Sequence, residues 1–236
     1  MRAEMADEQS TTKTVFLLRH GESEHNVSGV DEVDSQLTVR GCAQAASWRD
    51  EVTQLGVELV LVSPLRRTLR TACLAFEACR GTRLQICRQA RELYWHDQQC
   101  RGCGDDELAE LLCELPRGDE IEGLEELDEP SALWDPAGEA RLAADPDGAN
   151  ILAQRARQCA ASLPSAVGAH PERCIAVATS WGVISQLTGI GPDNCDIVVC
   201  ELTRQRRGHG THVWKLEAKE TRSSPHALAE EAAEGQ

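Results

Sequence analysis

The chain has 236 residues, a formal net charge of −15 and 41% hydrophobic residues. That length fits one large domain with a full hydrophobic core better than two small ones. The negative charge argues against nucleic acid or an anionic membrane as a partner. No apolar stretch approaches the roughly 20 residues that span a bilayer. The first residues include acids and lack the apolar core of a secretory signal.

The eleven cysteines are scattered and odd in number, and many lie in apolar surroundings. We therefore expect reduced thiols in a cytoplasmic protein. A rival interpretation is a zinc site made by His96, Cys100, Cys103 and Cys113. A single Cys-x-x-Cys pair is a weak signal in a chain so rich in cysteine. Free thiols are favoured, and neither a metal nor an organic cofactor is expected.

Apolar and polar segments alternate along the chain. A run at 15–18 predicts a first strand, and Thr38 is placed to cap a helix that Gly56 ends after about Leu55. A strand at 57–62 leads to Ser63 and Pro64, the expected start of a second helix. That helix has an apolar face made by Leu65, Leu69, Ala72, Cys73 and Phe76. The further predicted elements are a strand at 84–87, a helix at about 150–163, a strand at 175–178, a helix from about 182, and strands at 196–202 and 211–217.

This alternation predicts an α/β fold, a three-layer α/β/α sandwich with a mostly parallel sheet. The domain is expected at 13–217, with 1–12 and the acidic tail 218–236 disordered. Residues 105–129 hold twelve acids and one base, yet their leucines keep helical spacing. They predict an insertion at about 105–130, containing an amphipathic helix that Pro116 ends. The insertion either lies on the surface or caps the site.

The most informative motif follows the first strand and begins Arg19-His20-Gly21-Glu22, ending at Asn26. The carboxyl end of a parallel strand is where open α/β sheets bind ligands. Arg19 offers a planar fork for phosphate oxygens, and Gly21 allows a close approach of the backbone. An imidazole in such a setting can attack phosphorus and carry it as a phosphohistidine. A turn with a satisfied histidine is the alternative.

Three later segments bear on the same chemistry. Arg67 lies near the start of the second helix, where free backbone N–H groups favour an anion. Glu92 follows the strand at 84–87, and one interpretation is that it pairs with Arg91 or Arg88 at the surface. Trp181 precedes a glycine after the strand at 175–178, either as a pocket wall or as a packed core aromatic.

Taken in order, these segments resemble the histidine phosphatase superfamily, which includes phosphoglycerate mutases and many phosphomonoesterases. The resemblance covers about residues 14–202 and implies a phosphoglycerate mutase-like fold. It implies that His20 is the nucleophile, that Arg19, Asn26 and Arg67 bind phosphate, and that Glu92 is the acid. The family has a histidine where this chain has Trp181. A second departure is Gly148-Ala149-Asn150, where relatives often have glycine, glutamate and serine. A later arginine of those relatives is comparable to Arg155 or Arg157.

The resemblance implies a phosphomonoester hydrolase, of the histidine acid phosphatase or phosphoglycerate mutase-like kind, acting on a small phosphorylated substrate. Losing one preorganised donor at position 181 is expected to reduce its rate on the order of 10²–10³. A catalytically inactive phospho-ligand-binding pseudophosphatase is the alternative, and a phosphoglycerate mutase-type phosphotransferase is a more remote one. The pattern sets no oligomeric state.

Overall fold

The computed structural model describes residues 12–93, 98–128, 146–207 and 211–234. The strands are β1 (Thr12–Arg19), β2 (Leu59–Val62), β3 (Arg83–Ile86), β4 (Ile121–Glu122), β5 (Cys174–Thr179), β6 (Ile197–Arg206) and β7 (His212–Arg222). The helices are α1 (Glu24–Ser28), α2 (Val39–Ala46), α3 (Arg66–Ala75), α4 (Asp105–Glu114), α6 (Pro146–Ala169), α7 (Trp181–Thr188) and α8 (Pro225–Glu234). Short 3₁₀ helices lie between several of them.

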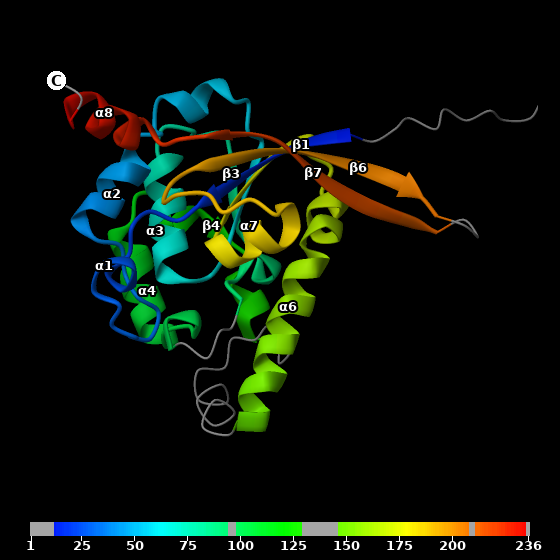
Figure 1. Cartoon of the computed structure of the whole chain (residues 1–236), viewed down its shortest axis with the longest axis horizontal. Helices are drawn as coiled ribbons and strands as arrows, with labels where there is room; N and C mark the ends of the chain where they lie inside the picture. The colour runs from blue at the N-terminus through cyan, green and yellow to red at the C-terminus, as the bar shows by residue number, and fades with distance from the viewer. Residues whose placement is uncertain (1–11, 94–97, 129–145, 208–210, 235–236) are drawn as a thin grey trace, which may run out of the picture.

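The strands form one seven-stranded sheet in the order β4-β3-β2-β5-β1-β6-β7. The pairings from β4 through β1 are parallel, whereas β6 pairs antiparallel with both β1 and β7. The mostly parallel sheet predicted from the alternation of strands and helices is confirmed. In Figure 1 the hairpin of β6 and β7 extends away from the body of the molecule, and the long helix α6 crosses the sheet.

Alternate residues of each central strand face opposite layers. In β1, Phe16 and Leu18 pack in one core cluster, together with residues of α2, α3 and α4. Val15 and Leu17 pack in the other cluster, together with residues of α6 and α7. Because both faces are covered, residues 15–18 of the strand are all apolar, as expected for a buried parallel sheet. This arrangement is the predicted three-layer sandwich.

Several predicted boundaries were wrong. The helix expected at 38–55 ends at Ala46, and a separate 3₁₀ turn covers Glu51–Gln54. Between them Trp48 is 1% exposed and its Nε1 donates to Cys195 O at 2.7 Å. The chain therefore leaves the helix next to a buried indole that is bonded to a distant segment. Helix α3 starts at Arg66, later than expected, with Leu65 as its N-cap residue, and Ser63 donates its N–H to Ala178 O of the sheet.

The two ends of the predicted domain have different outcomes. Residues 1–11 lie outside the described ranges, whereas much of the expected disordered tail 218–236 is ordered in β7 and α8. Ser224 N–H donates to Asp196 Oδ1 at 3.3 Å, and His226 N–H donates to Ser47 Oγ at 3.2 Å. These backbone contacts hold α8 beside α2. The polar, acidic composition of the tail alone therefore did not predict that it forms a strand and a helix.

The acidic segment predicted as an insertion takes part in the main core. Its residues 121–122 form β4, which extends the sheet beside β3. Leu108, Leu111 and Leu115 are buried in the same cluster as residues of the central strands. The acids of α4 whose side chains are described face solvent, as the amphipathic pattern predicts. The segment therefore builds one edge of the domain.

Candidate functional site

The candidate site lies where three parallel strands end. β1, β2 and β5 are neighbours, with Arg19 opposite Thr179 and Val62 opposite Ala178. His20 continues this pairing by donating its backbone N–H to Thr179 O at 3.0 Å. The first motif therefore stands at the edge of the sheet where open α/β folds form a ligand crevice.

Two glycines let the chain pass close to itself just after the motif begins. A Cβ atom at Gly21 would collide with Gly41 O, and one at Gly41 would collide with Glu22 O. Thr38 fixes the same turn, because its hydroxyl accepts from Gly41 N–H at 2.9 Å and donates to Glu22 Oε1 at 2.8 Å. Glu22 therefore anchors the motif to the start of α2.

His20 is 4% exposed, and its orientation is fixed by one contact. Its Nδ1 lies 2.7 Å from Gly21 O. Because a carbonyl oxygen only accepts, Nδ1 carries the proton of the neutral ring and Nε2 keeps a lone pair. Burial lowers the pKa of His20 well below 6.5, and the positive charges of Arg67 and Arg19 lower it further. The ring is therefore neutral at physiological pH, the form that a nucleophile needs.

The charges of two guanidinium groups act on this imidazole, one from the buried Arg67 and one from the partly buried Arg19. Arg67 is 1% exposed and donates from Nη1 to Gln99 O at 2.9 Å. Arg19 donates from Nη1 to Pro192 O at 2.8 Å. The Nε atoms of both side chains are buried and have no partner among the described residues. Buried donors without a partner are rare in native proteins, so these atoms are suited to a bound anion.

The neighbouring arginines of α3 have other partners. Arg66 donates from its backbone N–H to Asp34 Oδ1 at 2.9 Å and from Nε to Asp34 O at 2.9 Å. Arg70 pairs with Glu114 at 3.5 Å. The structure therefore places Arg67, among these three, beside the candidate nucleophile.

The carboxylate of Glu92 contacts the first turn of α7. Its Oε1 accepts from Leu93 N–H at 2.8 Å, and the backbone N–H of Gly182 donates to the same carboxylate. A Cβ atom at Gly182 would collide with Oε1, so the glycine makes room for the acid. Burial raises the pKa of Glu92, against the opposing effects of Arg67 and Arg19. The alternative of a surface pair is wrong, because Glu92 is held by backbone groups in the site.

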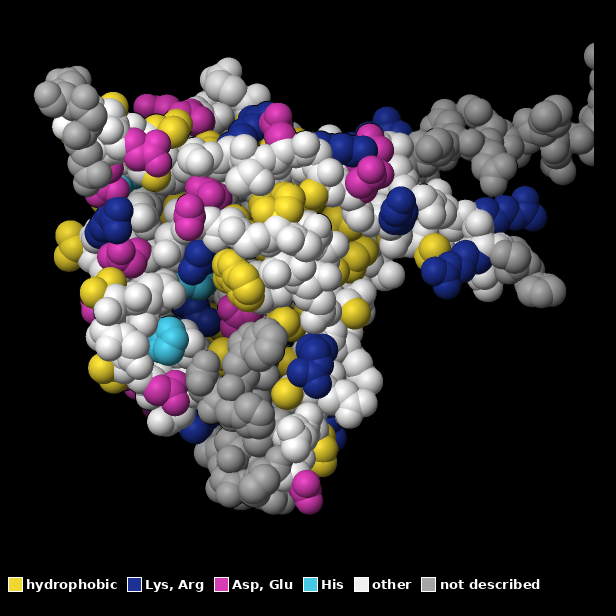
Figure 2. Space-filling model, in the orientation of Figure 1, with side chains coloured by type: hydrophobic (Ala, Val, Ile, Leu, Met, Phe, Trp, Pro, Cys, Tyr) yellow, Lys and Arg dark blue, Asp and Glu magenta, His cyan; other side chains and the backbone are white. Residues whose placement is uncertain are grey.

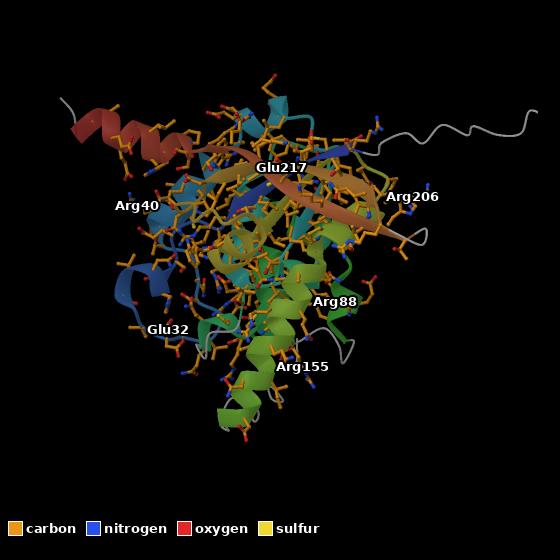
Figure 3. The ribbon with its side chains drawn as sticks, turned by 45° about the vertical axis from the view of Figure 1, so that its right-hand side comes forward. Glu32, Arg40, Arg88, Arg155, Arg206 and Glu217 are labelled. Carbon is orange, nitrogen blue, oxygen red and sulfur yellow. The ribbon has the colours of Figure 1, made fainter. Side chains whose placement is uncertain are left out.

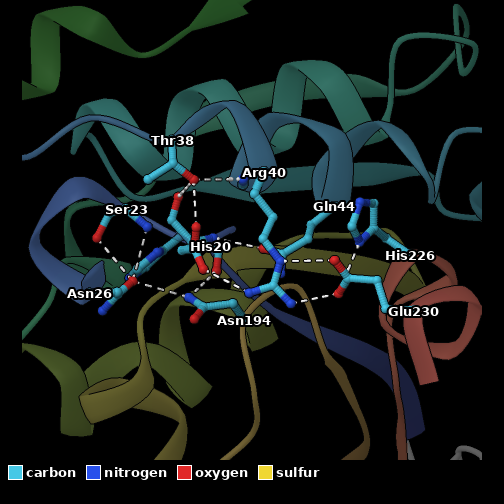
Figure 4. Close-up of polar contacts among 11 residues, drawn as sticks. His20, Ser23, Asn26, Thr38, Arg40, Gln44, Asn194, His226 and Glu230 are labelled. Carbon is cyan, nitrogen blue, oxygen red and sulfur yellow. Dashed lines mark hydrogen bonds and ion pairs between the residues drawn. The ribbon is translucent and has the colours of Figure 1, made fainter. Parts of the chain in front are cut away.

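Asn26 takes part in a polar network beside the nucleophile (Figure 4). Its Oδ1 accepts from Ser23 N–H at 3.0 Å and Ser23 Oγ at 2.9 Å, at the start of α1. Asn194 donates from Nδ2 to both Asn26 Oδ1 and His20 O, each at 3.2 Å. The donor that Asn26 can offer to a phosphoryl oxygen is therefore Nδ2.

Trp181 is the first residue of α7 and is 43% exposed. The alternative of a packed core aromatic is therefore wrong. A Cβ atom at Gly191 would lie 2.9 Å from the indole Nε1, so the ring rests against that glycine. Its neighbour Gly182 donates its backbone N–H to Glu92, and the carbonyl oxygen of Pro192, next to Gly191, accepts from Arg19. Trp181 therefore lies at the edge of the site. On the face shown in Figure 2, basic, acidic, histidine and apolar side chains lie together near α7.

Two serine hydroxyls were not predicted as site groups. Ser63 directly follows β2 and Ser180 directly follows β5, and both are fully buried. Neither Oγ has a hydrogen-bond partner in the described part of the chain, although Ser180 is the N-cap residue of α7. Ser180 follows Thr179, which pairs with His20 across the sheet. A serine between a strand and a helix is the signal that could have identified it.

Arg155 and Arg157, the later arginines compared with the family, are exposed on α6; Figure 3 shows Arg155 on the outer side of that helix.

His96, needed for the zinc alternative, lies outside the described residues. Within the ranges that are described, no group of three or more histidine, cysteine or acidic side chains could hold a metal ion. All eleven cysteines are free thiols. None of the described helices combines the length and apolarity needed to cross a bilayer.

Comparison with known proteins identifies relatives of the segment that carries the first motif. The model of the histidine phosphatase superfamily (branch 1) matches residues 15–117. A probable phosphatase of Schizosaccharomyces pombe is 44% identical over 62 residues, which are 25% of this chain and 22% of that protein. A 2,3-bisphosphoglycerate-dependent phosphoglycerate mutase of Nocardioides is 42% identical over 71 residues, 28% of this chain and 29% of the relative.

The matched segments thus span less than a third of these curated relatives. Among solved structures, a mycobacterial glucosyl-3-phosphoglycerate phosphatase bound to VO₃ is 20% identical, with a TM-score of 0.47, 86% of this chain covered and 97% of the other. The family match and the curated relatives together support the histidine phosphatase superfamily, which holds phosphatases and phosphoglycerate mutases.

Proposed function

We propose that this histidine phosphatase-type chain is a phosphomonoester hydrolase that works through a phosphohistidine on His20. The observation that carries the proposal is the setting of the imidazole. Its Nδ1 is held by Gly21 O, which leaves Nε2 unprotonated, and both neighbouring cations favour the neutral ring. The same cations, Arg19 and Arg67, have buried Nε donors suited to phosphoryl oxygens.

In the first step Nε2 of His20 attacks phosphorus and the bond from phosphorus to the ester oxygen breaks. Glu92 gives its proton to the departing alcohol, and its raised pKa favours the protonated form required. In the second step a water attacks phosphorus, the bond to Nε2 breaks, and Glu92 takes the proton of that water. Phosphate leaves with the starting enzyme restored. Arg19, Arg67 and Asn26 hold the phosphoryl oxygens throughout, so the proposal needs neither metal nor cofactor.

The pseudophosphatase is the second candidate, and the position of Trp181 favours it. The indole stands at the edge of the site where the family has a histidine, and it offers one neutral donor. In this version the two arginines still bind a small phosphorylated ligand, but turnover is lost. A phosphoglycerate mutase would need the phosphohistidine to survive until a second hydroxyl accepts the phosphoryl group. We favour hydrolysis over transfer, because the site has lost one phosphoryl partner.

The deciding experiment is incubation with p-nitrophenyl phosphate at mildly acidic to neutral pH, beside the variant His20→Ala. A hydrolase that works through His20 releases p-nitrophenol from the wild-type chain and not from His20→Ala. Acid quenching is avoided because acid hydrolyses phosphohistidine, and the intermediate is detected at alkaline pH by phosphorus NMR. No His20-dependent release, together with phosphate binding by the wild-type chain, would favour the pseudophosphatase.

A further inference from the structure

The exposed indole of Trp181 is a large apolar surface at the edge of a polar site. Its 43% exposure contrasts with Trp48, which is 1% exposed in the core. The ring is supported from one side by Gly191, where any side chain would displace it. A tryptophan that is rigidly backed and open to solvent is suited to stacking on a flat partner.

The position of the ring relative to the acid identifies what it would contact. Glu92 is held by the backbone N–H of Gly182, the residue next to Trp181. The ester oxygen that Glu92 protonates must therefore lie near the start of α7. Arg19, which faces the phosphoryl group, is tied to Pro192, next to the glycine under the indole. The organic part of a bound monoester therefore leaves the pocket past Trp181.

Charge near the same edge disfavours a second anionic group on the substrate. Asp193 and Asp196 both lie close enough to Arg19 to act on its pKa. The chain as a whole carries a net charge of −15. A leaving group that bears its own carboxylate or phosphate would meet these acids, whereas an uncharged ring would not.

We propose that Trp181 is a specificity-determining residue that stacks on an uncharged, ring-shaped leaving group, so that the substrates are phosphomonoesters of aromatic alcohols. This inference rests on the proposed function for the direction in which the alcohol leaves. Replacement of the family's histidine then changes substrate choice, in addition to any loss of rate.

The test compares two phosphonates, which have no leaving group and so report binding alone. Benzylphosphonate places a ring one atom from phosphorus, and methylphosphonate has no ring. We expect wild-type protein to bind benzylphosphonate about tenfold more tightly, as stacking on an aromatic side chain allows. Trp181→Ala should reduce this ratio to about twofold or less, and Trp181→Phe should keep most of it. Leu228→Ala, which removes an exposed apolar side chain of α8, should leave the ratio unchanged.

Calorimetry on each variant gives both dissociation constants, and a cooperative melt checks that each one folds. The use of a ratio cancels any general change in phosphoryl binding. An equal ratio in wild type and Trp181→Ala would overturn the inference, even if His20-dependent hydrolysis is found. A ratio that depends on Trp181 in a protein that hydrolyses nothing would support it, while the proposed hydrolase would fail.

Discussion

Arg67 acts on both titratable groups of the candidate site. Its charge lowers the pKa of His20, in the same direction as burial, and so favours the neutral form of the proposed nucleophile. It also opposes the effect of burial on Glu92, whose pKa nevertheless stays raised. One guanidinium therefore favours a neutral base without removing the proton of the acid. Such opposite environments for neighbouring groups are how acid and base roles are divided in a site.

A bell-shaped pH profile follows from these two shifts. Hydrolysis needs neutral His20, so kcat/KM rises as pH rises through a pKa that lies below 6.5. It also needs protonated Glu92, so kcat/KM falls as pH rises through a pKa that lies above 4.5. Glu92→Gln should remove the alkaline limb and lower kcat/KM for an alkyl phosphate by about 10²-fold.

Steady-state rates with two substrates check this assignment. The loss in Glu92→Gln should be much smaller for p-nitrophenyl phosphate, whose leaving group needs no proton. An alkaline limb that persists in Glu92→Gln would show that another group supplies the proton.

Removal of Arg67 should abolish the response of the protein to phosphate. Ligand at 100 times its dissociation constant stabilises the native state by about 2.7 kcal/mol, so phosphate or vanadate should raise the Tm of the wild type. Arg67→Ala should show no such rise, with an unchanged far-UV spectrum. Arg70→Ala is the matched control, because Arg70 lies on the same helix but pairs with Glu114. A normal shift in Arg67→Ala would mean that the phosphate site lies elsewhere.

Trp181→His should increase hydrolysis of a small alkyl phosphate. The imidazole restores the kind of donor that the family has at this position, and the other groups are present. We expect a gain of about 10-fold or more in kcat/KM, equivalent to at least about 1.4 kcal/mol of transition-state stabilisation. Because the indole is 43% exposed, the change does not leave the cavity that loss of a core aromatic creates.

The gain should vanish when His20→Ala is added, because both groups serve one step. The comparison is valid for a variant that melts cooperatively and still responds to phosphate. If such a variant gains nothing, the missing histidine is not what limits the rate, and the pseudophosphatase becomes the better proposal.

At the scale of elements, the central strands were predictable and several helix ends were not. Runs such as 15–18 and 59–62 are apolar because both faces of the sheet are covered, and that pattern is visible in the sequence. The end of α2 lies next to Trp48, whose indole donates to Cys195 O, 147 residues away, a contact that the local sequence pattern does not reveal. The helix α8 could not be predicted in the tail, because the groups that accept its first backbone hydrogen bonds, Asp196 and Ser47, come from distant segments.

The same distinction applies to the site. His20, Arg67 and Glu92 belong to local motifs, and the structure brings all three together. Asn194 was missed because its role depends on a contact with His20 O across 174 residues of sequence. The unpartnered hydroxyl of Ser180 was missed because an N-cap serine is expected to bond its own helix, which it does not do.

Helix α8 is tied to the motif through one arginine (Figure 4). Arg40 contacts Glu22 Oε2 at 2.9 Å, and it also pairs with Glu230. Since the side chains of Arg40 and Glu230 are 50% and 39% exposed, solvent weakens their attraction. A double-mutant cycle of Arg40→Ala and Glu230→Ala should give a coupling of roughly 0.2–1 kcal/mol in unfolding free energy. A coupling above that range would show that α8 contributes to holding the nucleophile motif.

At the scale of the whole molecule, a strongly acidic chain surrounds a candidate site in which two arginines lie near His20. The positive charge is local, in Arg19 and Arg67, while the net charge is −15. The acids of α4 lie close in the chain to Gln99, whose carbonyl oxygen accepts from Arg67. We propose that the acidic segment 105–129 repels substrates with several phosphates from the mouth of the site. Such repulsion acts over long distances and is screened by salt.

Turnover of a multiply phosphorylated substrate, relative to a monophosphate, should therefore improve as ionic strength rises. The Debye length falls to about 10 Å at 0.1 M salt, which removes most of the repulsion between exposed charges. Neutralising two exposed acids of α4, Asp106→Asn with Glu110→Gln, should raise the same ratio at low salt. Glu217→Gln with Glu220→Gln makes an equal change of charge on β7, and it should have a smaller effect if the position of α4 matters. A ratio that is flat across ionic strength, or equal for both double variants, would show that the acidic segment is a solvated edge of the domain and does not select substrates.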